Sequence, residues 1–178
     1  MKHLKLLLVI LLAMYSQQGM AQLEKGNLLI GGTAGFDVEF EENNDNFLTI
    51  AINPMVARMV TDNVAFGGSL GLVYLKVGDF STSSFNVMPL VRYYVPGAGN
   101  AVLFIEAKAG LARMGSSFSG ESSSESAFQF SFGPGIAFFI ADNVSIDALL
   151  AYNRIGGDFD QSSFGLNIGF QVFLASKE

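Results

Sequence analysis

The sequence contains no cysteine and no tryptophan, and its single histidine, His3, lies at the extreme N-terminus. Without cysteine, disulfides, thiolate metal ligands and cysteine nucleophiles are all excluded. Acyl transfer and hydrolysis usually need a nucleophile activated by a neighbouring base, most often histidine. No His or Cys set with metal-ligand spacing and no phosphate-binding Gly-Lys motif is present. We therefore expect neither an enzyme nor a cofactor site, and no metal site built from His or Cys.

Charged residues and long apolar runs are also scarce. Only 15% of the 178 residues are charged, whereas 50% are hydrophobic, and ordinary soluble domains carry about 25% charged residues. Beyond the N-terminal segment no apolar run reaches the length of a membrane-spanning helix, about 18–20 residues. Inside lipid every backbone N–H and C=O must be paired within the protein, and a closed β-barrel achieves this pairing without helices.

The N-terminal segment has the pattern of a secretory signal peptide. A basic start precedes the apolar run Leu6 to Ala13, and small residues follow at Gly19 and Ala21. The apolar run is too short to cross a bilayer as a helix, which takes about 20 residues. We expect residues 1–21 to be a signal peptide that is cleaved, and residues 22–178 to form an outer-membrane β-barrel domain.

Apolar and small residues alternate strictly along most of the remaining chain. Phe128, Phe130 and Phe132 share one face of a segment whose other face carries smaller or polar residues. This period of two predicts strands, and a tilted transmembrane strand takes about 9–11 residues. The expected strands are residues 28–40, 47–60, 64–77, 84–95, 101–114, 128–140, 144–155 and 163–174.

The connections between these strands alternate in length. Long polar connections are expected at residues 41–46, 78–83, 116–127 and 156–162, and short turns at 61–63, 96–100 and 141–143. Outer-membrane barrels combine short periplasmic turns with longer outer loops. The predicted fold is therefore all-β, an eight-stranded antiparallel up-and-down transmembrane β-barrel with both ends on the periplasmic side.

The second face of the strands consists mostly of small residues, which suit the interior of a narrow barrel better than a hydrated surface. A soluble secreted ligand-binding barrel, the alternative fold, would place its large apolar residues inside instead. Four charged strand residues, Arg92, Glu106, Lys108 and Asp147, share the small-residue face. A basic side chain facing mid-bilayer costs about 2–4 kcal/mol. We expect an ionic network in the lumen; a gate or ion path is the functional alternative.

Three arginines, Arg58, Arg113 and Arg154, share the apolar face but stand near strand ends. A long cationic side chain can extend from such a position to the lipid headgroups.

Three prolines recur at one spacing on the apolar face. Pro54, Pro89 and Pro134 each precede a short turn by seven residues. Because proline lacks the N–H of a sheet ladder, each is expected to mark a bulge or a missing ladder bond. Their equal spacing predicts one level of structural kinks around the wall.

The expected outer loops are acidic and contain no lysine or arginine, so nucleic-acid binding is not expected. Their carboxylates could bind divalent cations that bridge to lipid headgroups or to a surface partner; solvated loop tips are the simpler interpretation. The acidic residues are Glu41, Glu42, Asp45, Asp79, Glu121, Glu125, Asp158 and Asp160.

With these features the chain resembles the small eight-stranded outer-membrane β-barrels of Gram-negative bacteria, the OmpA/OmpX-like family. Its last strand fits the polar-x-Gly-x-x-apolar-x-apolar signal of that family at Asn167, Gly169, Val172 and Leu174. The resemblance implies that the barrel assembly machinery reads these four residues. The chain departs from many family members in continuing beyond Leu174, where they end on an aromatic residue.

The sequence thus predicts a monomeric integral outer-membrane protein, in contact with outer-membrane lipids, whose lumen is mostly filled. A structural or surface-interaction role through the acidic outer loops is the favoured function. The first alternative is a narrow pore or transporter for small solutes, because glycines in the lumen leave room for water. The second is the soluble secreted barrel.

Overall fold

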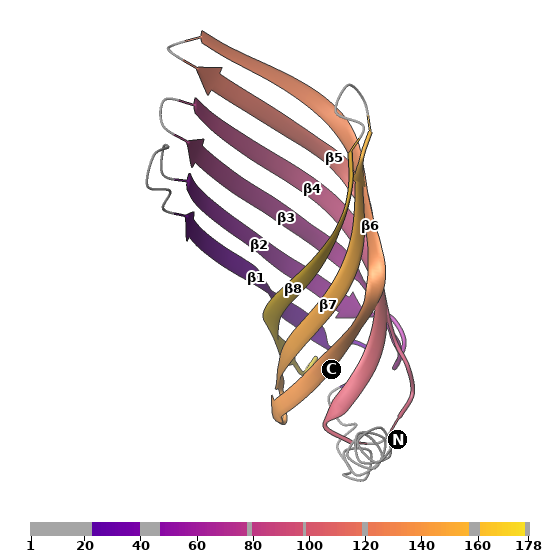
Figure 1. The fold of residues 1–178 in the computed structure, drawn as a ribbon. Coiled ribbons are helices and arrows are strands. Elements are labelled where there is room, and N and C mark those ends of the chain that lie inside the picture. Colours follow the sequence, from indigo (N-terminus) through magenta and orange to yellow (C-terminus); the bar gives the residue numbers. More distant parts are fainter. Residues whose placement is uncertain are drawn as a thin grey trace, which may run out of the picture.

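A computed structural model describes residues 23–39, 47–77, 80–97, 99–118, 121–156 and 161–176. It is a closed barrel in which strands β1 to β8 pair in chain order, all antiparallel (Figure 1). The strands are β1 (Leu28–Glu39), β2 (Phe47–Met59), β3 (Val64–Val77), β4 (Phe80–Tyr94), β5 (Ala101–Phe118), β6 (Glu121–Ala141), β7 (Val144–Ile155) and β8 (Gln161–Leu174). In these residues no helix is long and apolar enough to cross a bilayer. The predicted fold class is confirmed.

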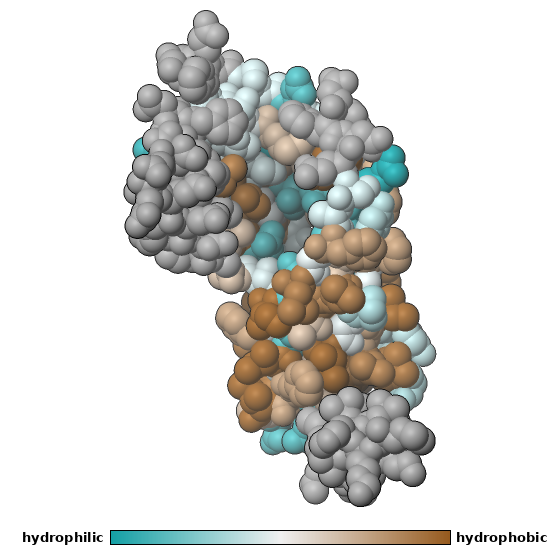
Figure 2. Space-filling model, viewed as in Figure 1, coloured by the Kyte–Doolittle hydropathy of each residue, from teal (hydrophilic) through white to brown (hydrophobic). Residues whose placement is uncertain are grey.

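The large apolar side chains lie on the outside of the barrel. Phe66, Leu111 and Phe128 are more than half exposed, as expected for a surface that meets lipid. Hydrophobic residues form the outer surface of the lower part of the molecule, and polar residues line the hollow above it (Figure 2). Inside, a core of Leu29, Met59, Tyr94, Phe104 and Phe173 fills the end of the barrel near the short turns.

The serine-rich segment expected as a loop at residues 116–127 is largely strand, so this prediction was wrong. β5 and β6 continue as a paired ladder from Ser116↔Ser123 to Phe118↔Glu121. Ser116 and Ser123 share a hydroxyl–hydroxyl hydrogen bond of 3.0 Å. Serine suits turns as well as strands, and such cross-strand pairs favour the extended form.

The connection expected at residues 78–83 is also shorter than predicted, because β4 already begins at Phe80. Thr82 pairs with Leu75 and Ser83 with Tyr74 across the β3–β4 ladder. The sequence analysis predicted a loop for these residues because they are polar.

The three prolines interrupt the ladder without shifting its register. Each is paired on one edge, Pro54 with Gly32, Pro89 with Gly68 and Pro134 with Ile105. On the other edge the pairing stops and resumes in the same register, as from Val87↔Leu111 to Leu90↔Lys108. The expected bulges are therefore absent at these prolines. The expected interruptions of the ladder are observed, because a proline has no N–H to donate.

Strands β1 and β8 close the barrel over a short seam. Their pairing runs only from Leu28↔Leu174 to Thr33↔Gly169, and beyond it the two strands diverge (Figure 1). Gly32 has a φ of 145°, a conformation that side chains rarely adopt. A Cβ on Gly169 would collide with the carbonyl oxygen of Gly32. Gly32 and Gly169 therefore allow the backbones of β1 and β8 to approach closely at the end of the seam.

Candidate functional site

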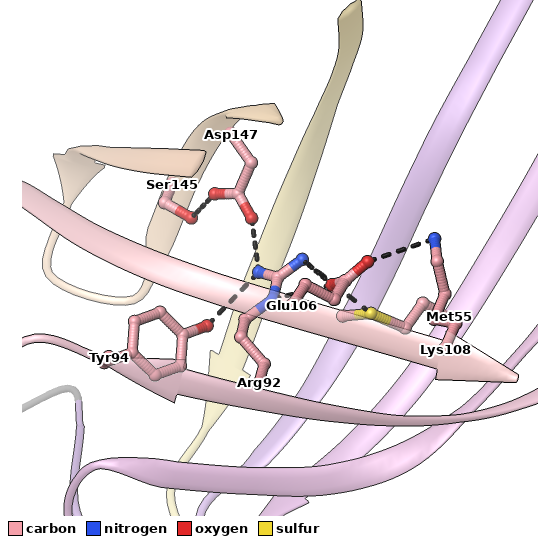
Figure 3. A network of polar contacts seen from close by, with 7 residues as sticks. All are labelled: Met55, Arg92, Tyr94, Glu106, Lys108, Ser145 and Asp147. Atoms are coloured by element: carbon pink, nitrogen blue, oxygen red, sulfur yellow. Dashed lines mark hydrogen bonds and ion pairs between the residues drawn. The ribbon is translucent and has the colours of Figure 1, made fainter. Parts of the chain in front are cut away.

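Four charged side chains meet inside the barrel, from strands β4, β5 and β7 (Figure 3). The Arg92 guanidinium donates from Nε and Nη2 to Glu106 Oε2 at 2.8 and 2.6 Å, and from Nη1 to Asp147 Oδ2 at 2.6 Å. Lys108 Nζ lies 3.0 Å from Glu106 Oε1. The structure thus places all four predicted lumen residues in one network.

Uncharged neighbours complete the contacts of the network. The Ser145 hydroxyl donates to Asp147 Oδ1 at 2.7 Å, and Arg92 Nη1 also donates to the Tyr94 hydroxyl at 3.3 Å. The Phe104 ring lies 4.1 Å from Arg92 Cζ, within the range of a cation–π interaction. Each carboxylate oxygen of Glu106 and Asp147 therefore has a donor, which buried charges require.

The network is almost dry. Arg92, Glu106 and Asp147 are 3%, 2% and 4% exposed, whereas the Lys108 side chain is 23% exposed. Two cations and two carboxylates give the group no net formal charge. The Asp147 carboxylate that accepts from the Ser145 hydroxyl is also ion-paired with Arg92, so the group is a charge-balanced network.

Aromatic rings fill the lumen beside the network, at the end near the short turns. The Tyr94 ring packs in tilted orientations against Phe104 and Phe173, at centroid distances of 5.9 and 6.4 Å, and the Phe139 ring centroid lies 5.2 Å from that of Phe173. All four rings are buried. The ionic network therefore has apolar rings on the side that faces the short turns.

A polar cavity of about 120 Å³ lies on the other side of the network, and Lys108, Arg92 and Glu106 are among its lining residues. It is roomy enough for several water molecules. Six of its lining residues are Asn or Gln: Asn53, Asn86, Gln129, Asn153, Asn167 and Gln171. Gln171 is 3% exposed, and its Oε1 has no hydrogen-bond partner among the described residues. The sequence analysis did not predict this group of carboxamide side chains. Their positions on the inward-facing side of the alternating pattern could have indicated it.

The other predicted site residues are spread over the molecule. Asn167 lines the cavity and Gly169 lies at the seam, while Leu174 faces outward on β8; Val172 pairs with Ile30. Nothing in this geometry bears on recognition by the assembly machinery, which stays a prediction.

The acidic outer positions mostly lie outside the described residues, namely Glu41, Glu42, Asp45, Asp79, Asp158 and Asp160. Glu121 and Glu125 belong to β6, and Glu125 is exposed. In the described part of the chain no group of three or more His, Cys, Asp or Glu side chains could hold a metal ion.

Comparison with protein families gives one match that spans nearly the whole chain. Residues 7–171 match the family described as the outer membrane protein beta-barrel domain. The chain belongs to this family. Family membership places this outer-membrane barrel in the cell outer membrane of the Gram-negative type, which rules out the soluble secreted alternative.

Two solved structures share the fold of this barrel. Neisserial surface protein A (NspA) superposes with a TM-score of 0.59 at 16% identity, covering 83% of this chain and 97% of that one. Ail, the attachment invasion locus protein of Yersinia pestis, gives a TM-score of 0.56 at 18% identity, covering 84% and 99%. Comparison with curated protein sequences yields no match. At these identities the likeness concerns the fold.

Proposed function

We propose that this protein is a non-conducting outer-membrane barrel that acts as a structural and surface-interaction protein. The observation that carries the proposal is the filled lumen, in which Arg92, ion-paired with Glu106 and Asp147, lies over the Phe104 ring and donates to the Tyr94 hydroxyl. A barrel of eight strands has an interior just wide enough to be filled by side chains. With the lumen filled, the outer surface of the barrel is what remains to contact other molecules.

Planar-bilayer recording of refolded residues 22–178 tests this proposal. We expect no steady conductance steps from the wild-type barrel. The variant Arg92→Ala/Tyr94→Ala/Phe104→Ala/Glu106→Ala/Phe173→Ala, which removes the central ion pair together with three buried rings, serves as the opened control and is expected to conduct. Reproducible steps from folded wild-type protein would contradict the closed lumen.

A narrow path for small solutes is the second candidate, and the polar cavity of about 120 Å³ favours it. The cavity ends at the ionic network, so passage requires that the network move. Under this alternative, Arg92→Ala and Glu106→Ala would change the conductance or the ion selectivity of wild-type steps. Silence of wild-type protein together with conductance of the opened control would remove this alternative.

The surface-interaction role rests on the acidic outer positions, which would bind divalent cations or a surface partner as carboxylate oxygens do. Calcium titration by calorimetry compares the wild-type barrel with Glu41→Gln/Glu42→Gln/Asp45→Asn. Heat of binding that the variant loses would support cation bridging, and identical isotherms would contradict it. Light scattering of the same samples tests the monomeric state.

A further inference from the structure

The apolar outer wall of the barrel carries a groove at β4 and β5 that reaches an arginine. The groove measures about 660 Å³ and runs past Phe85, Pro89, Ala109 and Leu111 to Arg113. A second groove of about 380 Å³ shares Pro89 and Ala109 with it and continues the hollow along the wall towards Phe66. The two together form one continuous apolar groove on the outer surface that faces lipid.

The sequence explains why the wall is hollow there. Ala107 and Ala109 are small outward residues, and Phe132 and Phe130 lie opposite them on β6. On the β4 side, the ladder pairing is missing at Pro89. Small side chains bordered by aromatic rings on one side and by a proline on the other leave a depression in the outer wall.

The charge at the end of the groove is of one sign. Arg113 is exposed; its Nη2 donates to the Ser124 hydroxyl at 3.0 Å, and it forms no salt bridge with a carboxylate of the described residues. Glu125 follows Ser124 on β6, so it points to the opposite face of the strand. Lys76 is also exposed near the outer end, on β3. Among the described residues, the charged side chains that face outward near the outer ends of the strands are therefore cationic.

We propose that Arg113 and the groove below it form a binding site for a phosphorylated lipid of the outer leaflet. The guanidinium and the Ser124 hydroxyl take the phosphate, because arginine offers several donors in a geometry that matches a phosphate. One acyl chain lies in the groove along Ala109 towards Phe66. Burial of the apolar chain and pairing of an otherwise unpaired cation stabilise the complex together.

The experiment measures retained lipid by native mass spectrometry of the folded residues 22–178 in detergent. The probe is bisphosphorylated lipid A, and the matched probe is the same glycolipid with its phosphates removed. Arg113→Gln is compared with Arg58→Gln, a substitution on the same outward face at the opposite end of the barrel, where Arg58 Nε donates to the Gly26 carbonyl. A third variant, Ala109→Phe, fills the groove and keeps the charge.

We expect Arg113→Gln to bind lipid A about tenfold more weakly, the loss of one charged hydrogen-bonded contact. Arg58→Gln should bind like wild type, and the dephosphorylated probe should bind equally to Arg113→Gln, Arg58→Gln and wild type. Ala109→Phe should weaken binding of both probes. Equal binding by Arg113→Gln and wild type would overturn the phosphate site, and unchanged binding by Ala109→Phe would overturn the acyl groove. Displacement of lipid A by millimolar inorganic phosphate alone would identify a general anion site and contradict a lipid site. Conductance does not enter this test, so its outcome is independent of the proposed function.

Discussion

At the scale of single residues, Arg92 decides whether the lumen can hold two buried carboxylates. It contacts both Glu106 and Asp147, and all three are almost fully buried. Removing one partner of a buried ion pair leaves an uncompensated charge and typically costs about 3–5 kcal/mol. We expect Arg92→Leu to lower the free energy of unfolding by an amount of that order, measured by urea titration of barrels folded in lipid vesicles.

Lys108 provides the matched control for that prediction. Its side chain is more exposed than that of Arg92, and its ion pair among the described residues is to Glu106 Oε1. Partly exposed pairs contribute about 1 kcal/mol or less. Lys108→Met should therefore have a much smaller effect than Arg92→Leu, and equal effects of the two substitutions would show that Arg92 does not hold the network together.

At the scale of elements, the glycines beside the proline interruptions fix how closely the strands pack. A Cβ on Gly110 would collide with the backbone oxygen of Val87 on β4, whereas a Cβ on Gly68 would find its nearest neighbour, the Met88 oxygen, at 3.8 Å. Forcing extra atoms into packed structure costs about 1–3 kcal/mol. We expect Gly110→Ala to destabilise the barrel by this order and Gly68→Ala to be near neutral, in the same urea titration. Similar stabilities of the two variants would mean that β4 and β5 shift apart freely at Pro89.

Strand limits also belong to this scale, and they mark what sequence patterns missed. Alternation located all eight strands because large apolar and small residues change places at every step, as in Phe128 to Phe132. It failed at residues 116–118 and 121–126, where serine on both faces leaves no alternation of hydropathy. Pairing with the neighbouring strand decided those residues.

At the scale of the whole molecule, the β1–β8 seam is the weakest closure of the barrel. Its pairing is confined to Leu28–Thr33, whereas β5 and β6 pair from Ala101 to Phe118. Local opening begins where few backbone hydrogen bonds must break. We expect amides of Leu29–Thr33 to exchange with deuterium faster than those of Leu103–Ala107, measured by mass spectrometry of the barrel in one detergent. Equal protection of the two segments would show that the barrel opens as a single unit.

The sequence by itself determined the class of fold, the face that meets lipid and the side of the wall on which Arg92, Glu106, Lys108 and Asp147 lie. These properties follow from a period of two and from the cost of charge in lipid, which are local to each strand. Only the tertiary structure joined Asp147 on β7 to Arg92 on β4, placed Gln171 over the lumen cavity and connected Ala109 with Arg113 and Phe130 in one groove. The physical reason is that register and closure set these distances, and both depend on pairing between strands far apart in the chain.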